Sequence, residues 1–313
     1  MSTDPFSDIL KFANAQSVVS GSFTVGGAWA IRWEADKIRF FGVVKGGCWL
    51  CIDGEEAPVR VERGDVFLLS ARRSFILAGD PANIPVDAVS VFSGGISKSA
   101  KLGDGGDCIQ IGGHVLLDPA SGGILMDVLP PLIHVRAASA QAATLQWLLD
   151  QLVREGAAEL PGAGAASAQL AQLIFIQLLR AFLAGGESFP VGWLRAFCDA
   201  RFAPALRLMH AEPGRLWRLE ELARSAAMSR TTFAVRFKAA AGVPPLTYLL
   251  NWRMRLAERA LREQNVSIFD LALSLGYTSE SAFSNAFKRV VGMAPKRYQT
   301  ACRAAGQANT LPA

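Results

Sequence analysis

Apolar residues between positions 18 and 130 occur in short runs that are separated by glycine, proline and charged residues. Four of these runs read FFGVVKGG, WLCIDGEE, APVRVERGD and VFLLSARRS. Runs of this length, rich in Val, Ile, Phe and Trp and bounded by turn residues, are typical of strands in a β sandwich or barrel. The pattern therefore predicts a β-rich amino-terminal domain.

The apolar pattern takes a helical period after Ala138. Leu145, Leu148, Leu149 and Leu152 are three or four residues apart, as on one face of a helix. After the break PGAGA, a second helix is predicted whose apolar residues lie almost all round it: Leu170, Leu173, Ile174, Leu178 and Leu179. A helix of that kind must be buried on more than one side. Packing on the β domain and a homodimer interface both satisfy this requirement, and the period does not choose between them.

The carboxy-terminal third contains an internal repeat. Its first copy, residues 217–248, reads WRLEELARSAAMSRTTFAVRFKAAAGVPPLTY, and its second, residues 267–298, reads SIFDLALSLGYTSESAFSNAFKRVVGMAPKRY. The offset is 49 before the turn and 50 after it, so the second turn holds one extra residue. Each copy predicts a short helix, a turn and a helix that begins at a cap, Ser229 in one and Thr278 or Ser279 in the other. Gly242 and Gly292 end these helices, which completes a helix-turn-helix layout.

Two phenylalanines four residues apart mark the inner face of the second helix in each copy, Phe233 with Phe237 and Phe283 with Phe287. The opposite face is expected to enter a major groove of DNA. The predicted DNA contacts in the first copy are Arg230, Thr231, Thr232, Ala234, Val235 and Lys238. Those in the second copy are Ser279, Glu280, Ser281, Ser284, Asn285 and Lys288. Asn285 is the best candidate for base recognition, because a carboxamide can contact adenine in bidentate fashion.

The distribution of charge supports a nucleic-acid partner. The whole chain has a net charge of +5, but from residue 211 onward there are 15 Lys and Arg against 7 Asp and Glu. That region carries +8 and the preceding residues carry −3. Because Lys and Arg contacts to phosphate dominate nucleic-acid affinity, double-stranded DNA is the predicted partner. An interaction protein whose helical repeat binds another protein is the alternative.

Two segments of this region resemble the AraC/XylS family of bacterial transcription regulators, MSRTTFAVRFKAAAGVPPLTYLLNWRMRLA and DLALSLGYTSESAFSNAFKRVVGMAPKRY. The resemblance covers residues 193–300 and implies sequence-specific DNA binding by two helix-turn-helix units joined by a linker helix. The amino-terminal segments GVVKGGCWLCIDGEEAPVRVERGDVFLLSARRSFIL and LPPLIHVR resemble the cupin-type ligand-binding domain of many family members. This resemblance implies control by a small organic effector, and RNA polymerase as a further partner if the protein is an activator.

Aromatic side chains of the amino-terminal domain are the candidates for lining an apolar effector pocket, although aromatic residues also dominate protein cores. The candidates are Trp29, Trp33, Phe40, Trp49 and Phe75. Metal-dependent cupins present histidines and a carboxylate inside the barrel. Here the strand from Trp49 to Ile52 has no His-x-His, and Ser74-Phe75 stands where a histidine is often found. We therefore predict no metal, no cofactor and no catalytic residue, and keep a cupin-type oxygenase or isomerase as the enzymatic alternative.

Cys48 and Cys51 form a Cys-x-x-Cys, but no second pair follows. Two small residues in a strand are the favoured interpretation over a zinc or redox site.

The sequence predicts an α+β multidomain chain. A cupin-like sensing barrel occupies residues 1–137, a helical dimerisation or linker segment 138–190, and a double helix-turn-helix domain 191–303. The first residues, MSTDPFSDILKF, contain no secretory signal pattern. The apolar stretch 170–183 is interrupted by Gln172, Gln177 and Arg180, which argues against a membrane span. A cytoplasmic homodimer with no membrane partner is expected.

Overall fold

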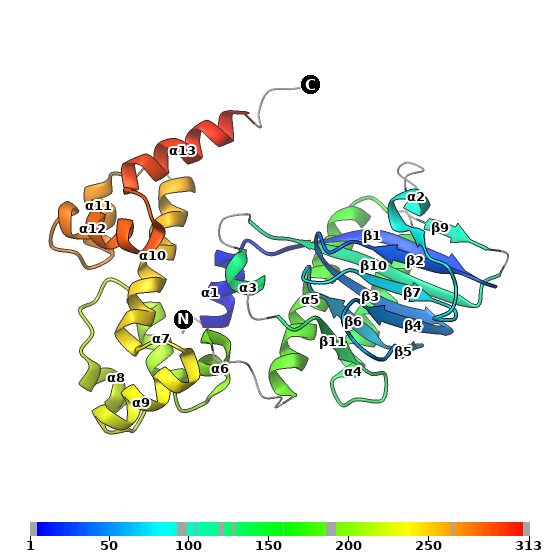
Figure 1. Ribbon diagram of the computed structural model, residues 1–313, viewed down its shortest axis with the longest axis horizontal. Helices are drawn as coiled ribbons and strands as arrows, with labels where there is room; N and C mark the ends of the chain where they lie inside the picture. Colours follow the sequence, from blue (N-terminus) through cyan, green and yellow to red (C-terminus); the bar gives the residue numbers. More distant parts are fainter. Residues whose placement is uncertain are drawn as a thin grey trace. The chain divides into compact units, whose positions relative to one another are not determined.

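The computed structural model describes residues 5–92, 99–103, 105–118, 122–126, 129–158, 160–185, 192–263 and 266–308. The chain divides into two compact units (Figure 1). One unit is Asn14–Glu187, and the other combines Met1–Ala13 with Ser188–Ala313. The first unit holds the strands, and the described residues of the second form helices and their connections. This division confirms the predicted α+β class.

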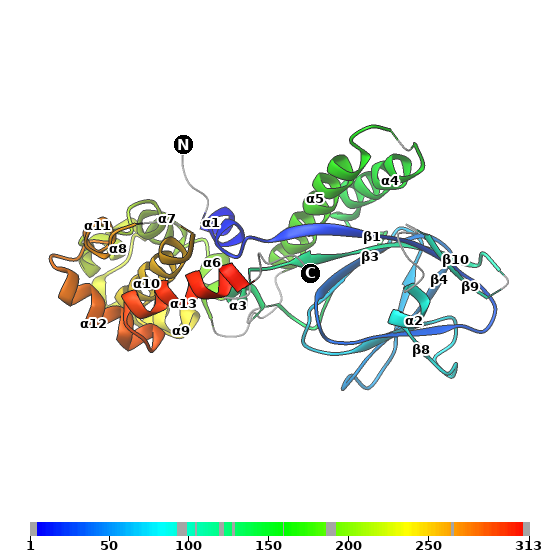
Figure 2. The same cartoon turned by 90° about the horizontal axis from the view of Figure 1, so that it is seen from above.

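Two sheets form opposite walls of the first unit (Figure 2). The larger sheet has the order β11-β6-β3-β10-β1-β9, and the smaller has the order β5-β4-β7-β2-β8. The strands are β1 (Gln16–Val25), β2 (Ala30–Trp33), β3 (Ile38–Lys45), β4 (Gly47–Ile52), β5 (Val59–Glu62), β6 (Val66–Leu69), β7 (Phe75–Ala78), β8 (Val86–Asp87), β9 (Ser99–Leu102), β10 (Cys108–Leu116) and β11 (Leu132–Val135). Two short helices accompany them, α2 (Ala88–Phe92) and α3 (Gly123–Met126). The apolar runs of the sequence thus form the expected strands.

The core of this unit lies between the sheets. Phe23, Phe41 and Phe67 of the larger sheet pack with Leu50 and Leu77 of the smaller one. Burial in β4 alternates, as expected for a strand with one face to the core.

Two long helices cover the outer face of the larger sheet, α4 (Ala142–Ala158) and α5 (Ala163–Ala184). Leu149 of α4 lies so close to β3 that a Cβ at Gly42 would be 2.3 Å from its side chain, so a larger residue there would force Leu149 to shift. Among the described residues, α5 alone is long and apolar enough to cross a membrane, and here it packs on α4 and β1. Its other side keeps Leu173 exposed, so the all-round burial expected from the sequence is incomplete in one chain.

The helical unit contains α1 (Pro5–Phe12), α6 (Trp193–Cys198), α7 (Ala203–Ala211), α8 (Leu219–Ser225), α9 (Arg230–Ala241), α10 (Pro245–Glu263), α11 (Ile268–Ser274), α12 (Glu280–Val291) and α13 (Pro295–Ala308). Phe6 of α1 lies 5.8 Å from Phe197, and Phe12 lies 5.6 Å from Trp252, measured between ring centroids.

The first helix therefore packs with the carboxy-terminal unit, whereas the sequence grouped residues 1–137 in one domain. The reason is that the apolar face of a short amphipathic helix shows that it is buried, but not against which partner. The predicted boundary between residues 190 and 191 lies outside the described residues.

Candidate nucleic-acid interface

Both copies of the repeat form a helix, a turn and a second helix, α8 with α9 and α11 with α12. The α8–α9 turn and the α11–α12 turn begin with the same backbone conformation and the same hydrogen bond. Ala227 and Gly276, which correspond in the repeat, have left-handed φ values of 51° and 82°. The next residue in each turn donates its N–H to an equivalent carbonyl, Met228 to Ala223 and Tyr277 to Ala272, each at 2.9 Å. The extra residue of the second turn follows this point, as the change of offset predicted.

Serine caps begin both recognition helices, α9 and α12. The Ser229 hydroxyl accepts the N–H of Thr232 at 3.2 Å, and the Ser279 hydroxyl accepts the N–H of Ala282 at the same distance. Ser279, not Thr278, is thus the cap of α12. Ser229 also donates to the hydroxyl of Thr232 at 2.8 Å. The hydroxyl groups of Thr232 and Ser279 are therefore engaged at the starts of the helices.

The paired phenylalanines are fully buried, as predicted. Phe233 and Phe237 pack edge-on against Phe202, the residue before α7, with ring centroids 6.0 and 5.3 Å from it. Phe283 contacts Tyr277 of the preceding turn, and Phe287 contacts Tyr298 of α13. These contacts hold each recognition helix by one face and leave the opposite face to solvent. Phe202 lies outside the repeat, so self-similarity gave no signal for it.

Most of the twelve predicted DNA contacts lie on the outward faces. Nine are exposed: Arg230, Thr231, Val235, Lys238, Ser279, Glu280, Ser281, Asn285 and Lys288. The other three are half-buried: Thr232, Ala234 and Ser284. Val235 is 64% exposed, so its methyl groups face solvent on the outward side of α9. Arg230 forms an ion pair at 3.0 Å with Glu220 of α8.

Arg253 of the linker helix α10 joins the two helix-turn-helix units. Its Nε donates to the Pro213 carbonyl at 2.6 Å, and its Nη2 donates to the Arg215 carbonyl at 2.8 Å, both in the loop before α8. The same guanidinium lies 5.9 Å from the ring of Tyr277, in the turn of the second unit. Partial burial lowers its pKa from the ordinary arginine value. Arg253 thus contacts the entry of one unit and the turn of the other.

Of the five predicted effector residues in the β-rich unit, Trp33 and Phe75 stack on each other with ring centroids 5.3 Å apart. Trp29, Phe40 and Phe75 are buried in the packing between elements, and Trp49 lies under the guanidinium of Arg60 at 5.3 Å. Trp33 alone of the five lines a cavity of about 480 Å³ between the larger sheet and α2. Lys37 and Arg39 also line this cavity, and no aromatic pattern in the sequence pointed to them.

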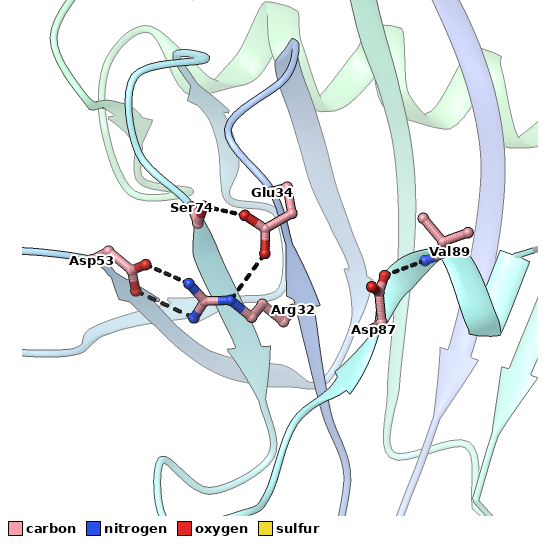
Figure 3. A network of polar contacts seen from close by, with 6 residues as sticks. All are labelled: Arg32, Glu34, Asp53, Ser74, Asp87 and Val89. Atoms are coloured by element: carbon pink, nitrogen blue, oxygen red, sulfur yellow. Dashed lines mark hydrogen bonds and ion pairs between the residues drawn. The ribbon is translucent and has the colours of Figure 1, made fainter.

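Ser74, which stands where metal-dependent cupins often have a histidine, belongs to an exposed polar network (Figure 3). Ser74 donates to Glu34 at 2.8 Å, and Arg32 binds Glu34 at 3.2 Å and Asp53 at 2.5 Å. Within the described ranges, no group of three or more His, Cys, Asp or Glu residues is placed to hold a metal.

Cys48 and Cys51, the two cysteines of the Cys-x-x-Cys, do not lie together in the structure. Residues three apart in a strand point to opposite faces, so Cys48 is buried while Cys51 is half-exposed. Cys48 lies instead beside Cys108 of β10, and the Gln110 amide donates to both sulfurs, at 3.0 and 3.5 Å. All three side chains are buried in the barrel core. The Cys-x-x-Cys spacing therefore marks no shared site.

Residues 4–184 match the family model described as Cupin, and residues 222–301 match the model described as Helix-turn-helix domain. A putative AraC-like transcription regulator of Streptomyces lividans is 39% identical over 297 residues, covering 95% of this chain and 98% of that protein. The HTH-type transcriptional regulator AlkR of Acinetobacter baylyi is 31% identical over 246 residues, covering 75% and 79%. The crystal structure of the DNA-binding domain of AdpA in complex with a target DNA has 31% identity, covers 34% of this chain and 95% of that one, and has a TM-score of 0.33.

Proposed function

The chain belongs to the AraC-like transcription regulators, and from this premise we propose that α9 and α12 bind successive major grooves of one DNA duplex. The observation that carries the proposal is the repeated construction of the two helices. Each has a serine cap, a buried phenylalanine pair and an outward face with a lysine near its end. Side chains so placed match the reach of a recognition helix into a major groove.

The roles that we propose differ between the helices. Asn285, with Ser281 and Ser284 beside it, supplies hydrogen-bonding groups for base edges. Thr231 and Val235 of α9 supply methyl groups that suit thymine, and Ala234 is small enough to let the backbone approach. Glu280 suits a cytosine amino group.

Cationic side chains take a second role in this proposal. Lys238, Lys288 and Arg230 bind phosphates, and Glu220 orients Arg230. Thr232 and Ser279 act chiefly through the caps that they form.

Selection of duplexes from a random pool by the full chain tests this function. We expect a bound sequence with two conserved segments centred about 10 base pairs apart. Affinity for it should fall steeply with rising salt, since phosphate contacts release counterions. A selection that enriches no sequence would contradict the proposal and favour a protein partner for the repeat.

We also propose that the β-rich unit binds a small organic effector and that the chain acts by binding rather than by catalysis, as a cytoplasmic homodimer. The cavity beside α2 supports an effector. Trp147 of α4 and Leu173 of α5, both exposed, support a dimer through these helices. RNA polymerase is the further partner if the protein activates transcription. Light scattering of the full chain and of Leu173→Glu tests the dimer, because only the variant should be monomeric.

A further inference from the structure

We propose that the cavity beside α2 binds an organic carboxylate with an apolar body, and that Arg39, Lys37 and His114 hold the carboxylate. This inference rests on the proposed function, in which the β-rich unit binds an effector, and it names the chemical class of that effector.

The cavity has the size and most of the lining of a small-molecule site. Its volume is about 480 Å³, within the range of about 300–1,000 Å³ that such sites occupy. Phe23, Trp33 and Phe41 form its apolar wall and contact one another with ring centroids 5.6–6.3 Å apart. Phe92 of α2 contacts both Phe23 and Trp33. An aromatic or aliphatic body of moderate size therefore finds apolar surface there.

Strand register explains why there is space beside Phe41. Gly112 of β10 lies opposite Phe41 of β3 on one side and opposite Gly21 of β1 on the other. Phe41, Gly112 and Gly21 thus lie side by side on three adjacent strands, and the two glycines have no side chain. A Cβ at Gly112 would lie 2.9 Å from the Phe41 ring. The glycines thus leave room that any larger residue would fill.

Two residues along the strands, on the same face of the sheet, lie a histidine and an arginine. His114 is two residues beyond Gly112, so it points to the same side of the sheet, and it lies opposite Arg39. Lys37 precedes β3 by one residue and lines the same cavity. A row of cationic and imidazole groups thus borders the apolar row, which is the arrangement that a carboxylate on an apolar body requires.

Among the described residues that act on His114, two cations, Lys37 and Arg39, face one acid, Asp36. Asp36 accepts from Arg39 Nη2 at 2.7 Å, but Arg39 Nε is buried and has no hydrogen-bond partner among the described residues. The Ser20 hydroxyl lies 3.0 Å from His114 Nδ1. Burial lowers the pKa of His114, and Lys37 and Arg39 lower it further against a smaller opposing effect of Asp36. The potential at His114 is therefore positive, and an anion there would be stabilised.

The short helix that completes the cavity is held in place by its own cap (Figure 3). Asp87 accepts the N–H of Val89 at 2.7 Å, and the Asp87 carbonyl accepts from the Ser90 hydroxyl at 2.6 Å. Ala88, Val89 and Phe92 of this helix all line the cavity.

A second cavity, of about 460 Å³, lies on the other face of the larger sheet, against α4 and α5. Among the described residues that line it, none carries a charge. This second cavity suits an uncharged apolar compound. A ligand bound there should therefore bind more tightly as the amide than as the carboxylate.

Matched probes test the inference. The full chain is titrated by calorimetry with 4-phenylbutanoate and octanoate, and with their neutral amides. We expect each carboxylate to bind at least about tenfold more tightly than its amide. Arg39→Gln should remove this preference and leave amide affinity unchanged, whereas the control Arg60→Gln, on the other sheet, should keep it.

Three results would overturn the inference: equal affinity for acid and amide, an unchanged preference in Arg39→Gln, or loss of carboxylate binding in Ala157→Phe, which fills the second cavity. Duplex binding is measured on the same preparations. A chain that binds its DNA and no carboxylate overturns only this inference, while a chain that binds no duplex overturns the proposed function.

Discussion

Gly214, in the loop before α8, and Gly276, in the turn between α11 and α12, are in direct backbone contact. A Cβ on Gly276 would lie 2.0 Å from the Gly214 carbonyl oxygen, and a Cβ on Gly214 would lie 2.2 Å from the Ser274 carbonyl oxygen. Arg253 binds the carbonyls on either side of Gly214, at Pro213 and Arg215. The spacing of the two recognition helices therefore depends on this contact as well as on the linker helix.

Gly276→Ala should destabilise the helical unit more than Gly292→Ala does. Both glycines have a left-handed φ, which costs another residue about 1–2 kcal/mol. At Gly276 the new Cβ would also meet backbone, whereas no atom of the described residues lies within 4 Å of a Cβ at Gly292. Overpacking of this kind adds about 1–3 kcal/mol. Urea unfolding of both variants measures the difference, and equal losses would show that the close contact is absent in solution.

Arg253→Lys should weaken binding to a complete two-groove site while base preference within each groove is retained. Lysine keeps the charge but cannot reach both carbonyls with a planar fork. Losing one charged hydrogen bond costs about 1.5–3 kcal/mol, part of which should appear as a roughly tenfold loss of affinity. The affinity is measured by titration with duplexes that contain both binding segments and with duplexes that contain only one. An equal loss on half sites would mean that Arg253 does not set the spacing.

Asn285→Ala should cost about 1–3 kcal/mol at one base pair and flatten the preference there. Lys238→Ala should instead weaken all sequences similarly and reduce the salt slope by about 1. Titrations against single-base variants of the selected duplex separate these outcomes. Unchanged base preference in Asn285→Ala would remove this residue from the recognition surface.

His114 should make the β-rich unit less stable in mild acid. Because its pKa in the folded chain is lowered from the ordinary value near 6.5, the unfolded chain binds more protons there. The stability that comes from neutral His114 is complete above the unfolded pKa and is lost as pH falls through it towards the folded pKa. The melting temperature should drop over this range in the native chain but less in His114→Gln. A carboxylate bound beside His114 should reverse part of the drop.

Local sequence was sufficient for the repeated helix-turn-helix units. The serine cap, the phenylalanines four residues apart and the closing glycine all act within about thirty residues, so their spacing alone predicts the fold of each unit. The extra turn residue was visible as a change of offset for the same reason. The β-rich class was likewise apparent from short apolar runs.

The cavity could not be predicted in that way. Trp33, Phe41, Phe92 and His114 come from four separate elements, and their meeting depends on strand pairing over long sequence distances. An aromatic residue signals burial but not which space it borders, so Trp29, Phe40 and Phe75 were equally plausible from sequence.

The sequence by itself determined the β-rich and helical regions, the two helix-turn-helix units and the buried faces of α9 and α12, because these follow from interactions between near neighbours. Tertiary structure alone decided which faces meet: α1 with the carboxy-terminal unit, Cys48 with Cys108, Gly214 with Gly276. A hydrophobic period shows that a face needs a partner, but the partner depends on how distant segments pair and pack.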